Sequence, residues 1–245
     1  MPASARPFRV DAAPARVTFD QAWALRPAAG RGSGLWALVG VGGDALAARG
    51  PDLGAGVPAF VVAGPGGSGR STILVAMARS LLSTGTRLVL VTPRPSPLRS
   101  LAGRDGVAAT FTGASLEEEE LARVLAAVEG PLAVMIDDGE LLRDCDASGE
   151  LSQVIAASAG AGPAFQRALV LAGDPEAGLC AGFGGWQVDA KRARRGALTA
   201  ATSVADGELI GARLTRAQAG QPARPGRCLL NAGDGHLVTV TVPAA

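Results

Sequence analysis

The sequence predicts an α/β protein with a mostly parallel sheet, helices on both faces and an antiparallel edge near its C-terminus. From residue 60 onward, short apolar runs typical of buried strands alternate with segments of helical apolar spacing. A glycine-rich loop joins the first of these strands to the first of these helices. Near the end, apolar stretches at residues 227–230 and 237–242 enclose a turn, which favours antiparallel strands.

The composition limits the class of protein. Of the 245 residues, 48% are apolar and 18% charged, which is typical of a soluble globular chain of one domain or slightly more. A net charge of +1 excludes a strong overall field towards nucleic acid or an anionic membrane. No run reaches the ~18 apolar residues of a membrane span, and the start lacks a signal-peptide pattern. We therefore expect a cytoplasmic protein without direct membrane insertion.

The cysteine and histidine content argues against several kinds of site. Cys145, Cys180 and Cys228 are far apart and form no C-x-x-C pair, so we expect reduced thiols. The single histidine, His236, falls in the turn predicted between the last two strands. A Ser-His-Asp triad or a histidine zinc site is therefore not expected.

The glycine-rich loop carries the strongest functional signal. Its spacing is that of the phosphate-binding motif G-x-x-x-x-G-K-[ST], with arginine in the place of lysine. Glycines allow positive φ, so that backbone N–H groups can turn inward, and the following helix adds its positive N-terminal end. The alternative is an ordinary turn before a helix. The predicted nucleotide-binding residues are Gly64, Gly66, Gly67, Ser68, Gly69, Arg70, Ser71 and Thr72.

A second signal is the pair Asp137 and Asp138, which follows the apolar run 131–136. Such a run predicts a buried strand that carries a carboxylate to the carboxyl edge of a parallel sheet, where ligands bind. Together with the loop, this placement predicts that Asp137 and the hydroxyl of Ser71 share a Mg²⁺ ion. Apolar strands that end in aspartate are also common without any function.

The remaining pattern predicts the other elements. Residues 1–30 are interpreted as a flexible N-terminal arm, in which Phe19 and Trp23 anchor an amphipathic piece, and 31–245 as one domain. Ser115 is expected to cap a helix whose acidic start, Glu117 to Glu120, faces solvent. The expected strands are 35–39, 87–92, 106–112, 167–173 and 209–214, and the expected helices are 72–82 and 151–157.

A loose dinucleotide fingerprint at Gly40, Gly42 and Ala45 is not accepted as a site. That fingerprint requires a long helix after its last small residue, whereas Gly50 and Pro51 stop any helix almost at once. We therefore expect a hairpin or bulge beside the main sheet.

The densest basic cluster is at residues 191–195, and it contains the only lysine, Lys191. It is open to three interpretations: a DNA contact, a source of an arginine finger from Arg194 or Arg195, or a solvated helix end. The near-zero net charge favours the solvated helix end. We expect any binding of duplex DNA to be weak and steeply dependent on salt.

The order of these segments resembles the FtsK/SpoIIIE family of P-loop motor ATPases, and is most similar to the degenerate ATPase modules of EccC-type ATPases of type VII secretion. The resemblance covers residues 17–243 and includes G-V-G-G-D at 40–44, the loop, T-P-R-P-S-P-L at 92–98, I-D-D-G-E at 136–140 and P-G-R-C-L-L at 225–230. It implies a RecA-like fold that binds ATP with Mg²⁺, beside other ATPase domains in a ring or tandem chain.

The sequence departs from active members of that family at two positions. Arg70 replaces the loop lysine, and Asp138 stands where a catalytic glutamate usually follows the magnesium aspartate, which makes Asp138 a weak general-base candidate. No N-terminal membrane segment and no C-terminal winged-helix domain are visible. The chain is thus expected to be a fragment or a stand-alone relative, attached in the cell to a membrane-bound motor.

Three functions remain open from the sequence. The first is a nucleotide-binding, hydrolysis-poor module that regulates or scaffolds a larger motor. The second is an active ATPase that translocates DNA or secreted protein, and the third is a structural domain with an empty nucleotide site. Arginine cannot take the point-charge position of lysine between the β- and γ-phosphates, so the first is favoured.

Overall fold

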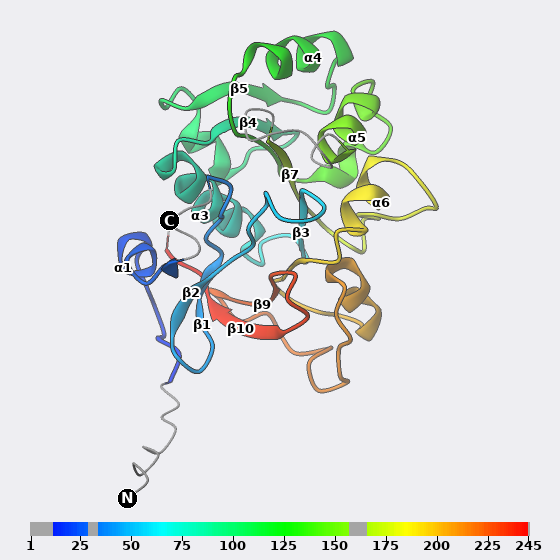
Figure 1. Ribbon diagram of the computed structural model, residues 1–245. Coiled ribbons are helices and arrows are strands. Elements are labelled where there is room, and N and C mark those ends of the chain that lie inside the picture. The colour runs from blue at the N-terminus through cyan, green and yellow to red at the C-terminus, as the bar shows by residue number, and fades with distance from the viewer. Residues whose placement is uncertain (1–11, 29–33, 157–165, 245) are drawn as a thin grey trace, which may run out of the picture.

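The computed structural model describes residues 12–28, 34–156 and 166–244 (Figure 1). Its centre is one ten-stranded sheet with the strand order β2-β1-β10-β9-β8-β3-β7-β6-β4-β5. The two strands that precede the predicted site residues, β3 (Ala59–Ala63) and β6 (Leu132–Ile136), are buried along their whole length. A strand buried on both faces has no polar side to show, which explains their uninterrupted apolar sequences.

Six neighbouring strands form the parallel part of the sheet. β3 lies between β7 and β8, and β6 lies between β7 and β4. The other parallel strands are β4 (Arg87–Thr92), β5 (Val107–Thr112), β7 (Arg167–Gly173) and β8 (Gly196–Leu198). All six therefore end at the same edge of the sheet, where their following loops meet.

Four antiparallel strands complete the sheet, and both ends of the chain contribute to them. They are β9 (Arg227–Asn231), β10 (Leu237–Thr241), β1 (Gly40–Gly42) and β2 (Ala47–Arg49). A Cβ at Gly40 would lie 2.6 Å from the Thr241 carbonyl oxygen, so this glycine serves the close pairing of β1 with β10. The predicted fold class and the predicted hairpin beside the main sheet are confirmed.

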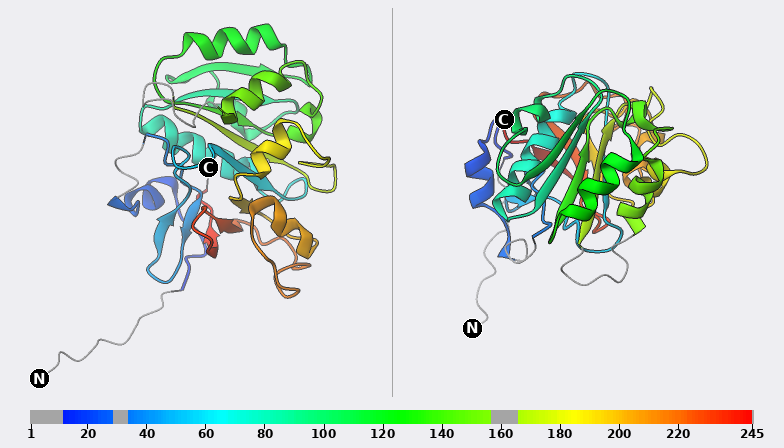
Figure 2. Two further views of the ribbon diagram at one scale, coloured as in Figure 1. Left: turned by 45° about the vertical axis from the view of Figure 1, so that its right-hand side comes forward. Right: turned by 90° about the horizontal axis from the view of Figure 1, so that it is seen from above.

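Helices cover both faces of the sheet (Figure 2). α3 (Arg70–Ser83) and the short 3-10 helix η1 (Pro97–Leu101) pack on one face. α4 (Glu118–Ala127), α5 (Ser148–Ala156) and α6 (Trp186–Lys191) pack on the other, with the 3-10 helices η2 (Gly139–Leu142) and η4 (Val204–Ile210). Along β3, Phe60 and Val62 enter the first core while Val61 and Ala63 enter the second, as the twofold alternation of a strand requires.

The described part of the N-terminal arm, residues 12–28, packs on the antiparallel edge. Its helix α1 (Phe19–Ala24) begins with a capping box between Thr18 and Gln21. Phe19 stacks on Trp23, and Trp23 in turn lies against Trp36, which confirms the predicted anchors. Residues 1–11, 29–33, 157–165 and 245 lie outside the described part, so the boundary at residue 30 stays a prediction, as does the end of the helix predicted at 151–157.

Three local predictions were wrong. Residues 209–214 do not form a strand, because a second capping box, between Ser203 and Asp206, starts η4, which ends at Gly211 with φ +66°. Ser115 does not cap α4: its hydroxyl donates to the Glu117 carboxylate, and Glu117 is the capping residue. The stretch 35–39 is not a regular strand: before β1 begins at Gly40 it forms one bridge, from Trp36 to Asp52, and single backbone hydrogen bonds to residues 49–53.

Candidate nucleotide-binding site

The predicted phosphate-binding loop leaves β3 and enters α3 directly. Gly64, Gly67 and Gly69 have φ of +158°, +75° and +103°, conformations that L side chains rarely adopt. A Cβ built on Gly66, Gly67 or Gly69 would meet no atom within 4 Å, so the space beside these glycines is open. The glycines thus provide backbone freedom and leave room for a ligand.

The start of α3 supplies hydrogen-bond donors to this open side. Its first intrahelical bond runs from the Ile73 N–H to the Gly69 carbonyl oxygen. The N–H groups of Arg70, Ser71 and Thr72 therefore have no carbonyl partner within the helix. α3 has 14 residues and no acidic residue in its own first turn, so no carboxylate of the helix itself competes for these donors. A phosphate group fits the donors and the charge of this helix start.

Ser71 and Asp137 come together although β7 separates their two strands in the sheet. The Ser71 hydroxyl donates to Asp137 Oδ2 at 2.6 Å, and the Asp137 side chain is almost fully buried at the end of β6. A hydroxyl and a carboxylate are hard oxygen ligands of the kind that Mg²⁺ prefers. No group of three or more acidic, cysteine or histidine residues that could hold a metal occurs in the described residues. The donor set therefore fits a metal that is held jointly with a nucleotide.

Arg70 does not extend into the open loop. Its Nη1 donates to the Gly64 carbonyl oxygen at 2.8 Å, and its Nη2 forms an ion pair with Asp138 Oδ1 at 2.8 Å. Only 8% of the residue is exposed. The guanidinium therefore ties the first glycine of the loop to the carboxylate that follows Asp137.

Asp138, the partner of Arg70, has an unusual backbone conformation. Its backbone is left-handed, with φ +53° and ψ +47°, a conformation in which aspartate and asparagine are several-fold enriched among non-glycine residues. Burial and then the neighbouring Asp137 raise the pKa of Asp138, and these effects outweigh the opposing charge of Arg70. The ion pair with Arg70 engages Asp138 Oδ1, and the role of Asp138 as a weak general base stays a prediction.

Glu140 is a further carboxylate at this edge that the sequence reasoning did not single out. Its Oε2 accepts the Asp174 N–H at 3.2 Å, just after β7, and burial raises its pKa. Gly173, at the end of β7, accepts the N–H of Gly64, so Glu140 lies beside the base of the loop. The sequence did contain a signal for Glu140, because this residue stands two positions after Asp138, close behind the end of a predicted strand.

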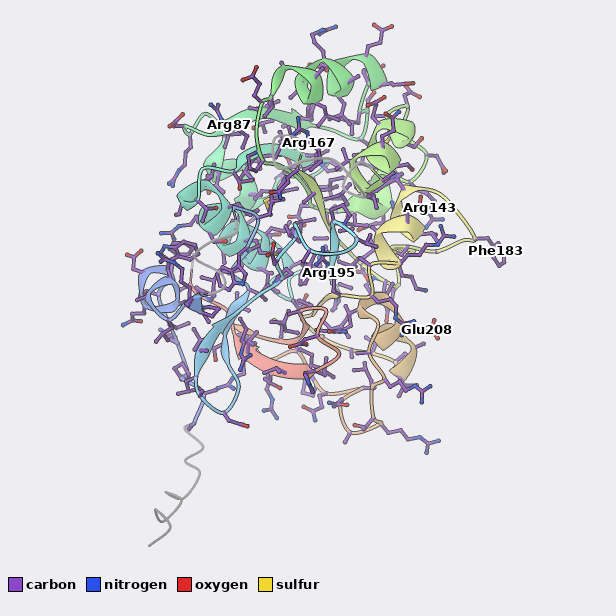
Figure 3. All side chains as sticks on the ribbon, viewed as in Figure 1. Arg87, Arg143, Arg167, Phe183, Arg195 and Glu208 are labelled. Atoms are coloured by element: carbon purple, nitrogen blue, oxygen red, sulfur yellow. The ribbon has the colours of Figure 1, made fainter. Side chains whose placement is uncertain are left out.

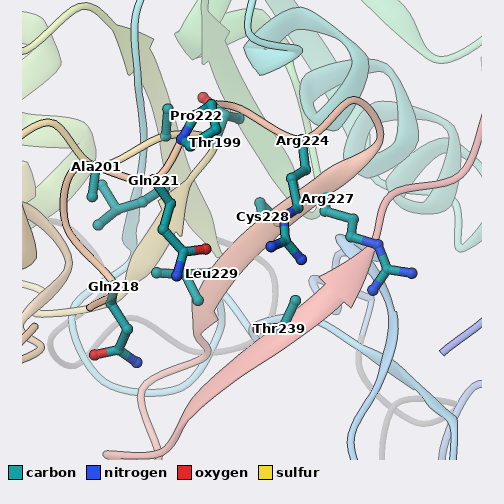
Figure 4. Close-up of a pocket in the computed structure, with 12 residues that line it drawn as sticks. Thr199, Ala201, Gln218, Gln221, Pro222, Arg224, Arg227, Cys228, Leu229 and Thr239 are labelled. Atoms are coloured by element: carbon teal, nitrogen blue, oxygen red, sulfur yellow. The ribbon is translucent and has the colours of Figure 1, made fainter. Parts of the chain in front are cut away.

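A cavity of about 200 Å³ opens beyond the loop on the side of β8 (Figure 4). Thr199 connects the two: it lines the cavity, and its Oγ1 lies 2.5 Å from the hydroxyl of Ser68 in the loop. The Ser68 hydroxyl also donates to the Pro65 carbonyl oxygen at 2.7 Å, which fixes the turn. Gln221, Arg224 and Arg227 give the cavity polar and cationic walls. β8 itself was not predicted, because it has only three residues and directly follows the basic cluster.

The basic cluster at 191–195 does not act as one patch. Arg195 is 5% exposed and donates to backbone carbonyls of the segment that leads into β3, those of Asp52, Leu53, Ala55, Val57 and Ala59 (Figure 3). Arg192 pairs with Asp189 at 2.6 Å, and Lys191 pairs with Glu208 at 3.7 Å. The interpretation of Arg195 as part of a solvated helix end is therefore wrong, and a buried side chain cannot reach a neighbouring subunit as an arginine finger.

Comparison with solved structures identifies similar folds. The cytoplasmic domain of EssC matches with a TM-score of 0.71 at 17% identity, covering 95% of this chain and 48% of that one. ATPases 2 and 3 of EssC from Geobacillus thermodenitrificans match with a TM-score of 0.71 at 18% identity, covering 94% and 44%. ATPases 2 and 3 of EccC from Thermomonospora curvata, in complex with a signal sequence peptide, match at 0.68 and 17%, covering 96% and 44%. The chain has the fold of these secretion ATPases.

The EssC and EccC matches confirm the predicted resemblance and the RecA-like P-loop class at the level of the fold. The chain spans less than half the length of each of these structures. No protein-family model and no curated protein matches the sequence. Among the helices that the structure describes, none is long and apolar enough to cross a membrane.

Proposed function

We propose that this chain is an ATP-binding, hydrolysis-poor module of an FtsK/SpoIIIE-type motor, in which it regulates or scaffolds translocation. The observation that carries the proposal is a contrast between two neighbouring pairs of residues at the start of α3 and the end of β6. The N–H groups at the start of α3 and the contact of Ser71 with Asp137 support a phosphate and a Mg²⁺ site, whereas Arg70 and Asp138 bind each other. Phosphate binding through backbone N–H groups does not require a free loop cation.

The nucleotide would extend across the loop in a defined direction. The phosphates would lie on the N–H groups of residues 66–72, and Mg²⁺, where bound, would neutralise phosphate charge next to Ser71 and Asp137. The nucleoside would point towards the cavity beyond Thr199, because Thr199 touches Ser68 and lines that cavity. Gln221 and Arg224 offer polar contacts for a base and a ribose there.

The partners follow from the fold neighbours. The EssC and EccC structures contain ATPase domains in tandem, which supports other ATPase domains as partners on the cytoplasmic side of a membrane-bound motor. The EccC structure holds a signal sequence peptide, which favours secreted protein over DNA as the moved substrate. With Arg195 buried and Lys191 and Arg192 paired, we expect only weak binding of duplex DNA.

Calorimetric titration with ATP and Mg²⁺ tests the assignment. Ser71→Ala and Asp137→Ala should each weaken binding of the metal complex at least about 10-fold, since each removes a metal-facing oxygen. Ser83→Ala, an exposed serine at the far end of the same helix, is the matched control and should bind like the unmodified chain. Failure of the unmodified chain to bind nucleotide would support the empty structural domain instead.

A further inference from the structure

A second serine reaches the same carboxylate oxygen as Ser71. The Ser96 hydroxyl donates to Asp137 Oδ2 at 2.6 Å, from the loop that joins β4 to η1. The Ser71 hydroxyl donates to that oxygen at 2.6 Å from the opposite side, on α3. Asp137 Oδ1 accepts the Asp138 N–H at 3.2 Å. Three protein donors therefore hold one buried carboxylate in a single orientation.

The loop around Ser96 is built to keep the hydroxyl in this place. Pro93, Pro95 and Pro97 alternate with other residues along it, and each proline fixes its own φ. Ser96 is also the capping residue of η1, because its oxygen accepts the Leu98 N–H at 3.1 Å. The Ser96 oxygen thus accepts from one partner and donates to the other, which leaves it little rotational freedom.

Two further contacts fix the loop to the body of the protein. Leu98 and Leu101 on η1 are buried in the core shared with α3. Arg99 donates from Nε to the Thr92 hydroxyl at 2.8 Å and from Nη2 to the Thr92 carbonyl oxygen at 2.7 Å. The start and the end of the loop are therefore tied together across Ser96.

We propose that Ser96 is a positioning residue for the metal of the bound nucleotide, acting through Asp137. Groups that hydrogen-bond to a metal-facing carboxylate fix its orientation, and their loss typically lowers metal affinity about 10- to 100-fold. Ser96 donates to Asp137 Oδ2 independently of Ser71, so it can hold this carboxylate while the Ser71 oxygen contacts a cation. The inference rests on the proposed nucleotide binding.

The experiment measures nucleotide affinity by calorimetry twice for each variant, with Mg²⁺ and with a chelator. The readout is the dissociation constant with chelator divided by the dissociation constant with Mg²⁺. This ratio reports how much the metal contributes to nucleotide affinity. In Ser96→Ala this ratio should fall about 10-fold or more, while affinity without metal stays unchanged. Ser96→Thr retains both the hydroxyl and the cap and should restore the ratio.

The measurement without metal separates the action of Ser96 on the metal from its role as a cap, and a matched control tests the effect of changing another serine of the same helix. Ser100→Ala changes an exposed serine on the same short helix and should leave the ratio unchanged. An unchanged ratio in Ser96→Ala, or an equal loss of affinity with and without metal, would overturn the inference while nucleotide binding stands. Absence of nucleotide binding in the unmodified chain would instead remove the proposed function, and this inference with it.

Discussion

The two sides of the phosphate-binding loop differ in what their polar side chains contact. On one side, Ser71 and Ser96 direct their hydroxyls at Asp137, an arrangement that prepares a carboxylate for a cation. On the other side, Arg70 and Asp138 contact each other, and Arg70 also holds the loop carbonyl of Gly64. In the proposed function, the first set of groups holds a nucleotide and the second would have to cleave it, so that binding can be kept while hydrolysis is lost.

The largest expected effect concerns turnover. The isolated chain should hydrolyse ATP very slowly or not at all, because the cation and the candidate base are paired with each other. The double variant Arg70→Lys with Asp138→Glu should raise the rate, since a positioned general base contributes about 10²–10⁴-fold. Steady-state phosphate release measures both proteins. The gain should be partial, because side chains from a neighbouring subunit are missing.

One result would contradict the comparison directly. Hydrolysis by the unmodified chain alone at about 1 s⁻¹ or faster, the ordinary range of enzymes, would show that the Arg70–Asp138 pair does not prevent catalysis. Arg70→Lys alone is the informative intermediate, because the single nitrogen of lysine replaces the two guanidinium nitrogens that contact Gly64 and Asp138.

The next effect concerns stability. Arg70→Met should destabilise the fold by about 3 kcal/mol, because it leaves Asp138 and the Gly64 carbonyl without their partner in a nearly dry environment. Adding Asp138→Asn should recover much of this loss, since no unpaired charge then remains. Urea unfolding of the single and double variants measures the coupling between the two residues.

An exposed ion pair serves as the control for that measurement. Lys191 and Glu208 are 3.7 Å apart, with 34% and 74% of their side chains exposed. Lys191→Met should cost less than about 1 kcal/mol, as is typical of surface pairs. Equal losses for Arg70→Met and Lys191→Met would show that the buried pair does not hold the loop.

The smallest effect is a dependence of stability on pH at Glu140. Burial raises the pKa of Glu140 in the folded state, so the folded protein binds more protons than the unfolded chain just above the ordinary carboxyl range. Stability therefore falls as the pH rises through that range, and the loss is complete above the raised pKa. Glu140→Gln keeps the acceptor for the Asp174 N–H and removes the charge.

Unfolding midpoints of both proteins from pH 4 to pH 8 measure this difference. The variant should gain stability relative to the unmodified chain as the pH rises towards neutrality. A constant difference across the series would mean that burial does not act on the ionisation of Glu140.

The sequence predicted those parts of the molecule whose pattern is local. β3, β4, β6 and β7 are uninterrupted apolar runs, and a run of that kind has few alternatives to a buried strand. The strand predicted at 209–214 was wrong because a capping box starts a 3-10 helix there. A capping box depends on only two side chains, so it is easily missed beside a run of apolar residues.

Contacts between distant segments could not be predicted from such patterns. The fixed spacing of the loop placed Ser71, and the strand end placed Asp137, but nothing in the spacing shows that Arg70 turns back to Gly64 and Asp138. The burial of Arg195 likewise depends on carbonyl groups about 140 residues away. In a basic cluster, an arginine in contact with solvent and one that fastens a loop look the same in the sequence.

The left-handed backbone at Asp138 has a consequence for substitutions at this position. Aspartate adopts the left-handed conformation with little strain, whereas a glutamate would have to occupy a conformation that longer side chains rarely take. A glutamate at position 138 would therefore act best together with a change in the main chain, which is a second reason to expect only a partial gain from the double variant.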